Sequence, residues 1–250
     1  MSAVIEAGTA TPTAGGATPA LEIRGLHAWY GESHILHGVD LTVQPGEVVT
    51  LLGRNGAGRT TTMRAVMGLT GARQGSIKIN GSETIERATH RIAQLGVGYC
   101  PEERGIFASL SAEENLLLPP RVGKAGGMSI EEIYAMFPNL KERAKSQGTR
   151  LSGGEQQMLA VARILRTGAR LLLLDEISEG LAPVIVQALA RMITALKARG
   201  YTIVMVEQNF RFAAPLADRF YVMEHGEIVE QFSAAELDSR RERLNELLGV

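Results

Sequence analysis

The strongest constraint on the fold of this chain is a glycine-rich loop that directly follows a continuous apolar run. The run is EVVTLLG, residues 47–53, and the loop is GRNGAGRTT, residues 53–61. An unbroken apolar run of this length is typical of a strand buried on both faces. The segment TTMRAVMGL that follows has the spacing of a helix. Strand, glycine loop and helix in this order predict an α/β fold with an anion-binding loop at the start of the helix.

The composition of this loop, here called the phosphate loop, suits a phosphate group. Its glycines can adopt backbone conformations that turn successive N–H groups toward phosphate oxygens. Thr60 stands where a hydroxyl binds Mg²⁺ in such loops, and Thr61 lies beside it. For the glycine spacing alone, a glycine-rich turn without a ligand is the alternative. The expected contacts with a nucleotide come from Gly53, Arg54, Asn55, Gly56, Ala57, Gly58, Arg59, Thr60 and Thr61.

A second apolar run, RLLLLDE at residues 170–176, ends in two acidic residues. Asp175 should emerge at the carboxyl end of a buried strand, the edge where ligands bind in open α/β sheets. There Asp175 is expected to hold Mg²⁺, and Glu176 to polarise the water that attacks a γ-phosphate. An acidic turn after a strand is the alternative for this segment taken alone.

A third segment, LSGGEQQMLAVARIL at residues 151–165, begins a periodic helix with a serine and two glycines. Ser152, Gly153 and Gly154 present a hydroxyl and unhindered N–H groups at the positive end of that helix, which predicts a second anion site. Glu155 completes a capping box with Ser152, so an ordinary capped helix also fits. Two glycines in a first turn are poor helix formers, and a close approach to another group explains them better.

The remaining pattern extends the α/β interpretation. Residues 21–30 and 34–43 alternate apolar and polar side chains and predict strands of an antiparallel or mixed sheet, while residues 201–209 predict another buried strand. A hairpin should turn at His225–Gly226, and residues 1–20 read as a disordered tail rich in Ala, Gly, Thr and Pro. Further capping boxes are predicted at Ser111/Glu114, Ser129/Glu132 and Ser233/Glu236.

Charge and cysteine content narrow the function classes. A formal net charge of -1 offers no general electrostatic reason to bind nucleic acid or an acidic membrane surface. Cys100 is the only cysteine, which excludes an intrachain disulfide and fits a reducing cytoplasm. No apolar run approaches the roughly 18 residues needed to span a bilayer, so we expect no direct membrane insertion.

Taken together, these segments resemble the ATP-binding subunits of ABC transporters. The matching motifs are GRNGAGRTT (Walker A), LSGGEQQ (the signature), LLLLDE (Walker B) and SEGLAP (the D-loop position), in family order over about residues 21–250. Within the family, PEERGIFASLSAEENLLLP, EISEGLAP and VEQNFRFA look most like the branched-chain amino acid importer ATPases. The urea and short-chain amide importers are the near alternatives.

The resemblance implies a P-loop NTPase core of the ABC type with a mainly parallel sheet and an N-terminal antiparallel β subdomain. It also implies a helical subdomain at about residues 102–170 and a C-terminal helix at about 233–248. ATP and Mg²⁺ would be bound between two subunits of a homodimer, or of a heterodimer with a paralogous ATPase. Ser152, Gly153, Gly154 and Glu155 would face the partner's nucleotide, and Tyr30 would stack on adenine.

The implied partners are the transmembrane permease subunits and a periplasmic substrate-binding protein, with this subunit peripheral on the cytoplasmic face of the bacterial inner membrane. The soluble ABC ATPases of translation or DNA repair form another class. Those usually carry two ATPase domains or a long coiled coil, and this chain has neither pattern. A subunit that binds ATP without turnover is a third class.

Four residues depart from the broader family pattern. Glu102 replaces the usual Q-loop glutamine and Gln208 the usual switch histidine, both as in the branched-chain amino acid subgroup. Glu102 can bind a cation, and Gln208 can hydrogen-bond a phosphate oxygen but carries no charge. Ile177 replaces a proline that commonly follows the Walker B acids, which removes no ligand.

Arg59 replaces the Walker A lysine, the largest chemical departure. A guanidinium keeps the positive charge but is wider and planar where a compact ammonium normally sits between two phosphates. Because phosphoryl transfer depends on positioning and charge stabilisation, we expect weakened nucleotide binding and strongly slowed hydrolysis. Glu176, Gln208 and Arg59 are therefore the residues expected to govern catalysis.

Overall fold

The computed structural model describes residues 17–122 and 126–248, so most of the predicted tail, residues 1–16, lies outside the described residues. The N-terminal part forms an antiparallel sheet of order β2-β1-β4-β5, as the alternating pattern predicts. Its strands are β1 (Leu21–Tyr30), β2 (Ser33–Val43), β4 (Arg73–Ile79) and β5 (Ser82–Glu83).

A second, central sheet has the order β10-β9-β3-β8-β7-β6 and is parallel except for the β9–β10 hairpin. This confirms the predicted mainly parallel sheet, and the hairpin turns at His225–Gly226 as expected. The strands are β3 (Val48–Gly53), β6 (Val97–Cys100), β7 (Leu171–Asp175), β8 (Thr202–Val206), β9 (Arg219–Glu224) and β10 (Glu227–Ser233).

The helices surround the central sheet. They are α1 (Arg59–Val66), α2 (Thr89–Ala93), α3 (Ala112–Leu117), α4 (Ile130–Met136), α5 (Pro138–Glu142), α6 (Gly153–Arg166), α7 (Pro183–Ala198), α8 (Phe210–Ala213) and α9 (Leu237–Leu248), with 3₁₀ turns η1 (Gly148–Arg150) and η2 (Ala234–Glu236). Across the described ranges, none of these helices has the length and apolar character needed to cross a membrane. All four predicted capping boxes are present, at Ser111, Ser129, Ser152 and Ser233.

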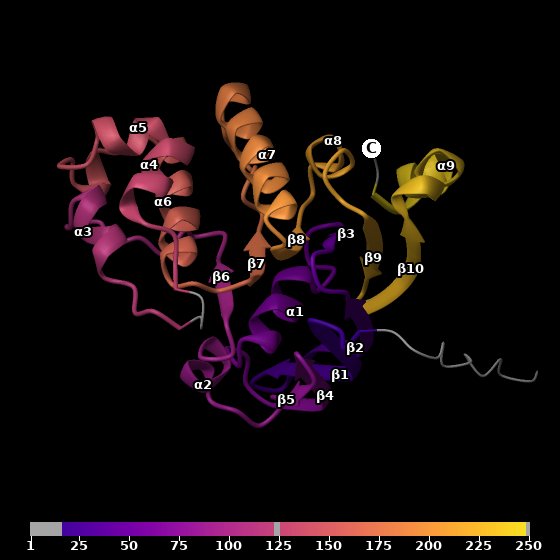
Figure 1. Cartoon of the computed structure of the whole chain (residues 1–250). Helices are drawn as coiled ribbons and strands as arrows, with labels where there is room; N and C mark the ends of the chain where they lie inside the picture. Colours follow the sequence, from indigo (N-terminus) through magenta and orange to yellow (C-terminus); the bar gives the residue numbers. More distant parts are fainter. Residues whose placement is uncertain (1–16, 123–125, 249–250) are drawn as a thin grey trace, which may run out of the picture.

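The central sheet is buried on both faces, which explains the continuous apolar runs. Along β7, Leu172 and Leu174 pack with the helices α6 and α7, whereas Leu171 and Leu173 pack with α1 and the antiparallel sheet. Figure 1 shows α7 and α8 on one side of the central sheet and α1 with the antiparallel sheet on the other. Cys100 is buried in the first of these cores, in agreement with an apolar packing role, and burial raises the pKa of its thiol to about 12.

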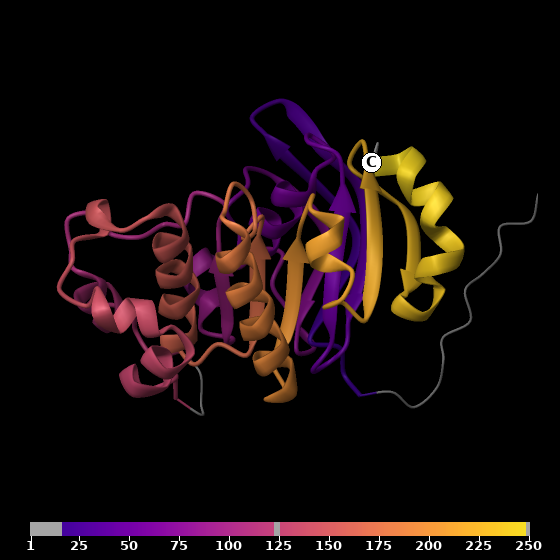
Figure 2. The same cartoon turned by 90° about the horizontal axis from the view of Figure 1, so that it is seen from above.

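The helices α3 to α6 gather at one end of the molecule, beyond β6 (Figures 1 and 2). Helical structure in this region begins at Ala112, and no helix is present over the ten residues from Glu102. The predicted helical boundary at Glu102 is therefore about ten residues early. Leu244 buries α9 against a small separate core with Phe220 and Phe232, so the predicted C-terminal helix packs on the hairpin strands.

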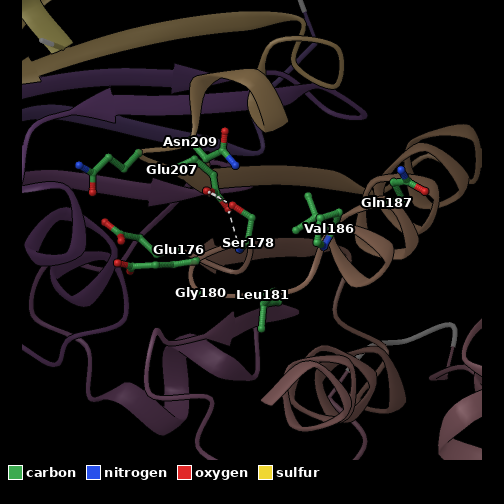
Figure 3. Close-up of a pocket in the computed structure, with 11 residues that line it drawn as sticks. Glu176, Ser178, Gly180, Leu181, Val186, Gln187, Glu207 and Asn209 are labelled. Carbon is green, nitrogen blue, oxygen red and sulfur yellow. Dashed lines mark hydrogen bonds between the residues drawn. The ribbon is translucent and has the colours of Figure 1, made fainter. Parts of the chain in front are cut away.

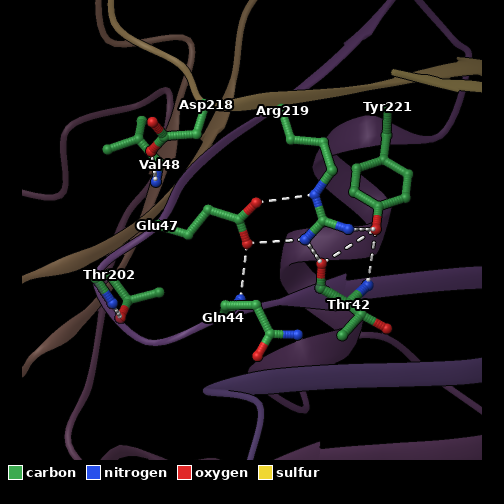
Figure 4. Close-up of polar contacts among 9 residues, drawn as sticks. Thr42, Gln44, Glu47, Val48, Thr202, Asp218, Arg219 and Tyr221 are labelled. Carbon is green, nitrogen blue, oxygen red and sulfur yellow. Dashed lines mark hydrogen bonds and ion pairs between the residues drawn. The ribbon is translucent and has the colours of Figure 1, made fainter. Parts of the chain in front are cut away.

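An ion pair between Arg219 and Glu47 links the starts of two strands of the central sheet and also connects to the antiparallel sheet through Thr42 on β2 (Figure 4). Arg219, at the start of β9, donates from Nε and Nη2 to the two carboxylate oxygens of Glu47, both at 2.8 Å. The same guanidinium donates to the carbonyl of Thr42 at 2.6 Å and to the Tyr221 hydroxyl at 3.1 Å. Because Glu47 directly precedes β3, this network fixes the position of the strand that leads into the phosphate loop.

Replacing this arginine should therefore destabilise the fold. Arg219→Met keeps the aliphatic stem but leaves Glu47 and the Thr42 carbonyl without a charged donor, at a cost of about 2 kcal/mol in the free energy of unfolding. Urea unfolding followed by circular dichroism measures this loss. Arg24→Met, which removes a surface pair with Glu22, should leave stability almost unchanged. Equal losses in the two variants would contradict the assigned role.

The two glycines at the start of α6 differ in their surroundings. A Cβ added at Gly154 would lie 2.7 Å from Ile185 Cγ1 on α7, closer than carbon atoms can approach. A Cβ added at Gly153 would meet only the flexible Arg104 guanidinium, at 3.4 Å. The close approach predicted for this glycine pair therefore exists within the chain at Gly154, as helix packing.

This difference predicts opposite effects of two neighbouring alanine substitutions. Gly154→Ala should lower the free energy of unfolding by about 1 kcal/mol, because overpacking against Ile185 outweighs the gain in helix propensity. Gly153→Ala gains the same propensity without the clash and should be neutral or stabilising. Urea unfolding of both variants makes the comparison. A Gly154→Ala protein as stable as Gly153→Ala would contradict the packing argument.

Candidate functional site

The phosphate loop connects β3 to α1, and its Gly58 has a backbone conformation that strongly favours glycine. Gly58 is the N-cap of α1 with φ 105°, a backbone conformation that L side chains rarely adopt. A Cβ there would also lie 2.9 Å from Leu36 Cδ2. The loop therefore wraps tightly over the start of α1, where the first N–H groups of the helix face any bound anion.

A pocket of about 420 Å³ lies over this loop and collects residues that are far apart in the sequence. We call it the phosphate pocket. Nine of its eleven lining residues were predicted to bind nucleotide or metal or to act in catalysis, whereas Ile35 and Glu179 were not predicted. The lining consists of Ile35, Asn55, Gly56, Ala57, Gly58, Arg59, Thr60, Thr61, Glu102, Glu176 and Glu179.

Asp175 lies under this pocket at the end of β7 and is fully buried. Its carboxylate accepts hydrogen bonds from Thr60 Oγ1 and from the Tyr99 hydroxyl, each at 3.0 Å. Burial raises the pKa of Asp175, and these two hydrogen bonds oppose that effect. Tyr99 was not predicted, although it stands on β6, directly beside β7 in the parallel sheet. The position of its strand relative to the Walker B strand was the missing information.

Arg59 does not lie free in the pocket but pairs with the predicted catalytic carboxylate. Its Nη2 donates to Glu176 Oε1 at 2.8 Å and to Asn55 Oδ1 at 3.2 Å. The Arg59 and Glu176 side chains are only 4% and 9% exposed, so the ion pair is shielded from water. Arg59 Nη1 is buried with no hydrogen-bond partner in the described part of the chain.

The backbone and the charge of Glu176 are both unusual. Its φ is 48°, in the left-handed region that non-glycine residues seldom occupy, and its N–H donates to the carbonyl of Val206 at 2.8 Å. The pKa of Glu176 is raised to about 7, chiefly by burial. The neighbouring Glu179 also raises this pKa, and Arg59 opposes the rise. A carboxylate with a pKa near neutrality suits the abstraction of a proton from water at physiological pH.

A second pocket of about 590 Å³ adjoins the first at Glu176 and is lined by Gln208 (Figure 3). We call it the adjacent pocket. Within it, buried Glu207 accepts hydrogen bonds from the hydroxyl and the N–H of Ser178, at 2.7 and 3.2 Å. Glu207 was not predicted as a site residue. It follows β8 directly, so the rule that found Asp175 at the end of β7 could have found it.

Several predicted residues line neither pocket. Tyr30 is 38% exposed at the end of β1. Arg54 points away and donates to the carbonyls of Glu246 and Leu247 on α9. Ser152 and Glu155 form their reciprocal cap at the start of α6, on a different part of the surface. This placement is the one expected if the signature segment serves a nucleotide held by another subunit.

The residues of the phosphate pocket fit a polyphosphate and a hard cation. The partnerless Nη1 of Arg59 needs an acceptor, and a phosphate oxygen is the strong acceptor for a guanidinium. The Thr60 hydroxyl and the Asp175 carboxylate, 3.0 Å apart, are oxygen donors of the kind that Mg²⁺ prefers beside phosphates. Over the described residues, no group of three or more His, Cys, Asp or Glu side chains could hold a metal ion.

Known proteins are similar to this chain in sequence and in fold. "High-affinity branched-chain amino acid transport ATP-binding protein BraG" of Pseudomonas aeruginosa is 40% identical over 221 residues, covering 85% of this chain and 92% of that protein. "Probable branched-chain amino acid transport ATP-binding protein LivF" of Archaeoglobus fulgidus is 33% identical, covering 85% and 91%. A nucleotide-free ATP-binding cassette from an ABC transporter has the same fold, with a TM-score of 0.79, 20% identity and coverage of 93% and 99%. The ABC transporter family itself is matched over residues 36–179, and this chain belongs to that family.

Proposed function

We propose that this chain binds and hydrolyses ATP to energise an ABC importer for branched-chain amino acids. The observation that carries the proposal is the meeting of the phosphate loop, Asp175 and Glu176 at one edge of the central sheet. The substrate class rests on the relatives BraG and LivF, whose names specify branched-chain amino acid transport. Importers of urea or short-chain amides are the alternative substrate class.

In this proposal each residue of the phosphate pocket has one task. The loop N–H groups and Arg59 bind the β- and γ-phosphates of ATP, and Glu176 accepts a proton from the attacking water. Mg²⁺, held by Thr60 and Asp175 with Glu102 nearby, would neutralise charge on the phosphates. Gln208, which lines the adjacent pocket, would hydrogen-bond a γ-phosphate oxygen.

The ion pair between Arg59 and Glu176 gives a physical reason for slow turnover. The guanidinium at 2.8 Å occupies one oxygen of the Glu176 carboxylate and opposes the rise of its pKa, so Glu176 is a weaker base toward water than it would be without Arg59. ATP must also compete with Glu176 for Arg59, which weakens nucleotide binding. A nucleotide-binding subunit with little turnover is therefore the second candidate function, and this ion pair is the observation that favours it.

Restoring lysine at position 59 tests this effect. In Arg59→Lys, the compact ammonium should bind the phosphates without engaging Glu176 so tightly, and ATP turnover should rise at least tenfold. Steady-state phosphate release with MgATP measures the change. Arg54→Lys is the matched control, because Arg54 points toward α9 and away from the phosphate pocket. Equal turnover by the original chain and Arg59→Lys would refute the proposed role of Arg59.

Two separate parts of the surface fit the proposed protein partners. Ser152, Gly153 and Gly154 lie away from this chain's own phosphate pocket, as a head-to-tail dimer with a second copy or a paralogue requires. A separate pocket of about 600 Å³ is lined by Leu69, Pro101 and Arg104, and Phe107 is 50% exposed on the same segment. We propose that this pocket receives the permease, which would place the subunit at the cytoplasmic face of the inner membrane.

The substrate class is testable in an assembled importer. The chain should copurify with its permease subunits, and leucine-loaded periplasmic binding protein should stimulate ATP hydrolysis by the complex in liposomes at least fivefold. Binding protein without amino acid, or mixed with urea or acetamide, is the control. The Arg59→Lys version provides a measurable basal rate. Stimulation by urea or acetamide in place of leucine would reject the branched-chain amino acid assignment.

A further inference from the structure

Glu207 is a buried carboxylate that the proposed mechanism does not use. It is 1% exposed, and no ion pair links it to a cation among the described residues. Removing a charge from water is expensive unless hydrogen bonds replace the lost hydration. Both carboxylate oxygens are accordingly occupied, Oε2 by the Ser178 hydroxyl and Oε1 by the Ser178 N–H. All of the observed polar compensation thus comes from one residue of the turn after β7.

That turn carries the predicted catalytic base. Ser178 follows Glu176 by two residues, and Ile177 between them is fully buried in the helix-side core. Glu176 itself is tied to the end of β8 through its N–H bond to the Val206 carbonyl. Glu207, the residue directly after β8, accepts hydrogen bonds from Ser178. The turn is therefore hydrogen-bonded on either side of Ile177 to two consecutive residues, Val206 through Glu176 and Glu207 through Ser178. Figure 3 shows the side chains of Glu176, Ser178 and Glu207 close together in the adjacent pocket.

The attachment is needed because the turn is held in a strained conformation. The positive φ of Glu176 is unfavourable for a residue with a side chain and persists only when surrounding contacts impose it. Ser178 is 4% exposed, so without Glu207 its N–H and hydroxyl would have no water to bond. Burial raises the pKa of Glu207 to about 7, and the two Ser178 hydrogen bonds favour its charged form.

We propose that Glu207 is a positioning residue for ATP hydrolysis, whose carboxylate holds Ser178 and thereby sets the Glu176 carboxylate against the attacking water. This inference rests on the proposed ATPase function and adds a residue to it. The proposed role depends on the hydrogen-bonding geometry of the Glu207 side chain and not on its charge. A glutamine can reproduce that shape, since its amide oxygen accepts from the Ser178 N–H and its amide nitrogen donates to the Ser178 hydroxyl oxygen.

The test compares Glu207→Leu, Glu207→Gln and Ser178→Ala, each in the original chain and in the Arg59→Lys background. Steady-state kinetics with MgATP give kcat and KM, and hydrogen–deuterium exchange follows the peptide that contains Ser178. Gln187→Ala is the control, because Gln187 lines the same pocket but is not bonded to the turn. Binding of an ATP analogue verifies that each variant is folded.

Glu207→Leu should lower kcat at least tenfold with KM within twofold of its parent, and should speed exchange at Ser178. Glu207→Gln should lose less than threefold in kcat, and Ser178→Ala, which deletes only the hydroxyl bond, should lie between them. If Glu207→Leu does not fold, Ser178→Ala decides, and a kcat equal to that of Gln187→Ala then overturns the inference.

Other outcomes also count against the inference. A Glu207→Leu kcat within twofold of the parent overturns it, as do equal losses in the Leu and Gln variants or a parallel rise in KM. Absence of turnover in both parents would instead refute the proposed ATPase function. In that case the exchange measurement still decides about the turn, because unchanged exchange in Glu207→Leu excludes the attachment.

Discussion

Parallel pairing of three strands buried on both faces is the constraint on which the rest of this structure depends. The register sets Asp175 opposite Val206 and Leu51 opposite Val206, so that β7 and β8 end at one level of the sheet and β3 extends two residues beyond it. The phosphate loop, the Walker B acids and Glu207 all leave the sheet at this edge. Apolar side chains on both faces hold the register, because a slip of one residue would exchange the two cores.

Charge balance at this edge explains the less usual contacts. Asp175 and Glu207 are buried, the Glu176 side chain is only 9% exposed, and Arg59 is the cation that contacts Glu176 directly. Without a nucleotide, Arg59 satisfies Glu176 but leaves one of its own nitrogens without a partner. A bound phosphate would satisfy that nitrogen and would weaken the hold on Glu176. In the proposed function, the same ion pair would connect nucleotide binding with the release of the Glu176 carboxylate.

The parts of the fold that could be predicted were those with strong local patterns. The buried strands, the hairpin and the four capping boxes follow from periodicity and from Ser/Glu spacing. The helices α2 and α8 were missed, because five and four residues are too few to establish a helical period. The start of the helices at Ala112 rather than Glu102 was missed as well, since the intervening loop is held by tertiary contacts, such as Asn115 bonding to the Phe107 backbone.

The sequence by itself determined the family, the order of the elements and most of the residues that line the phosphate pocket, because these depend on short motifs of consecutive residues. Only the tertiary structure decided what those residues contact. It paired Arg59 with Glu176 across 117 positions and Glu207 with Ser178 across 29, and it assigned Gly154 to helix packing. Such pairings arise from the burial of charges and the approach of separate elements, for which no local pattern carries a signal.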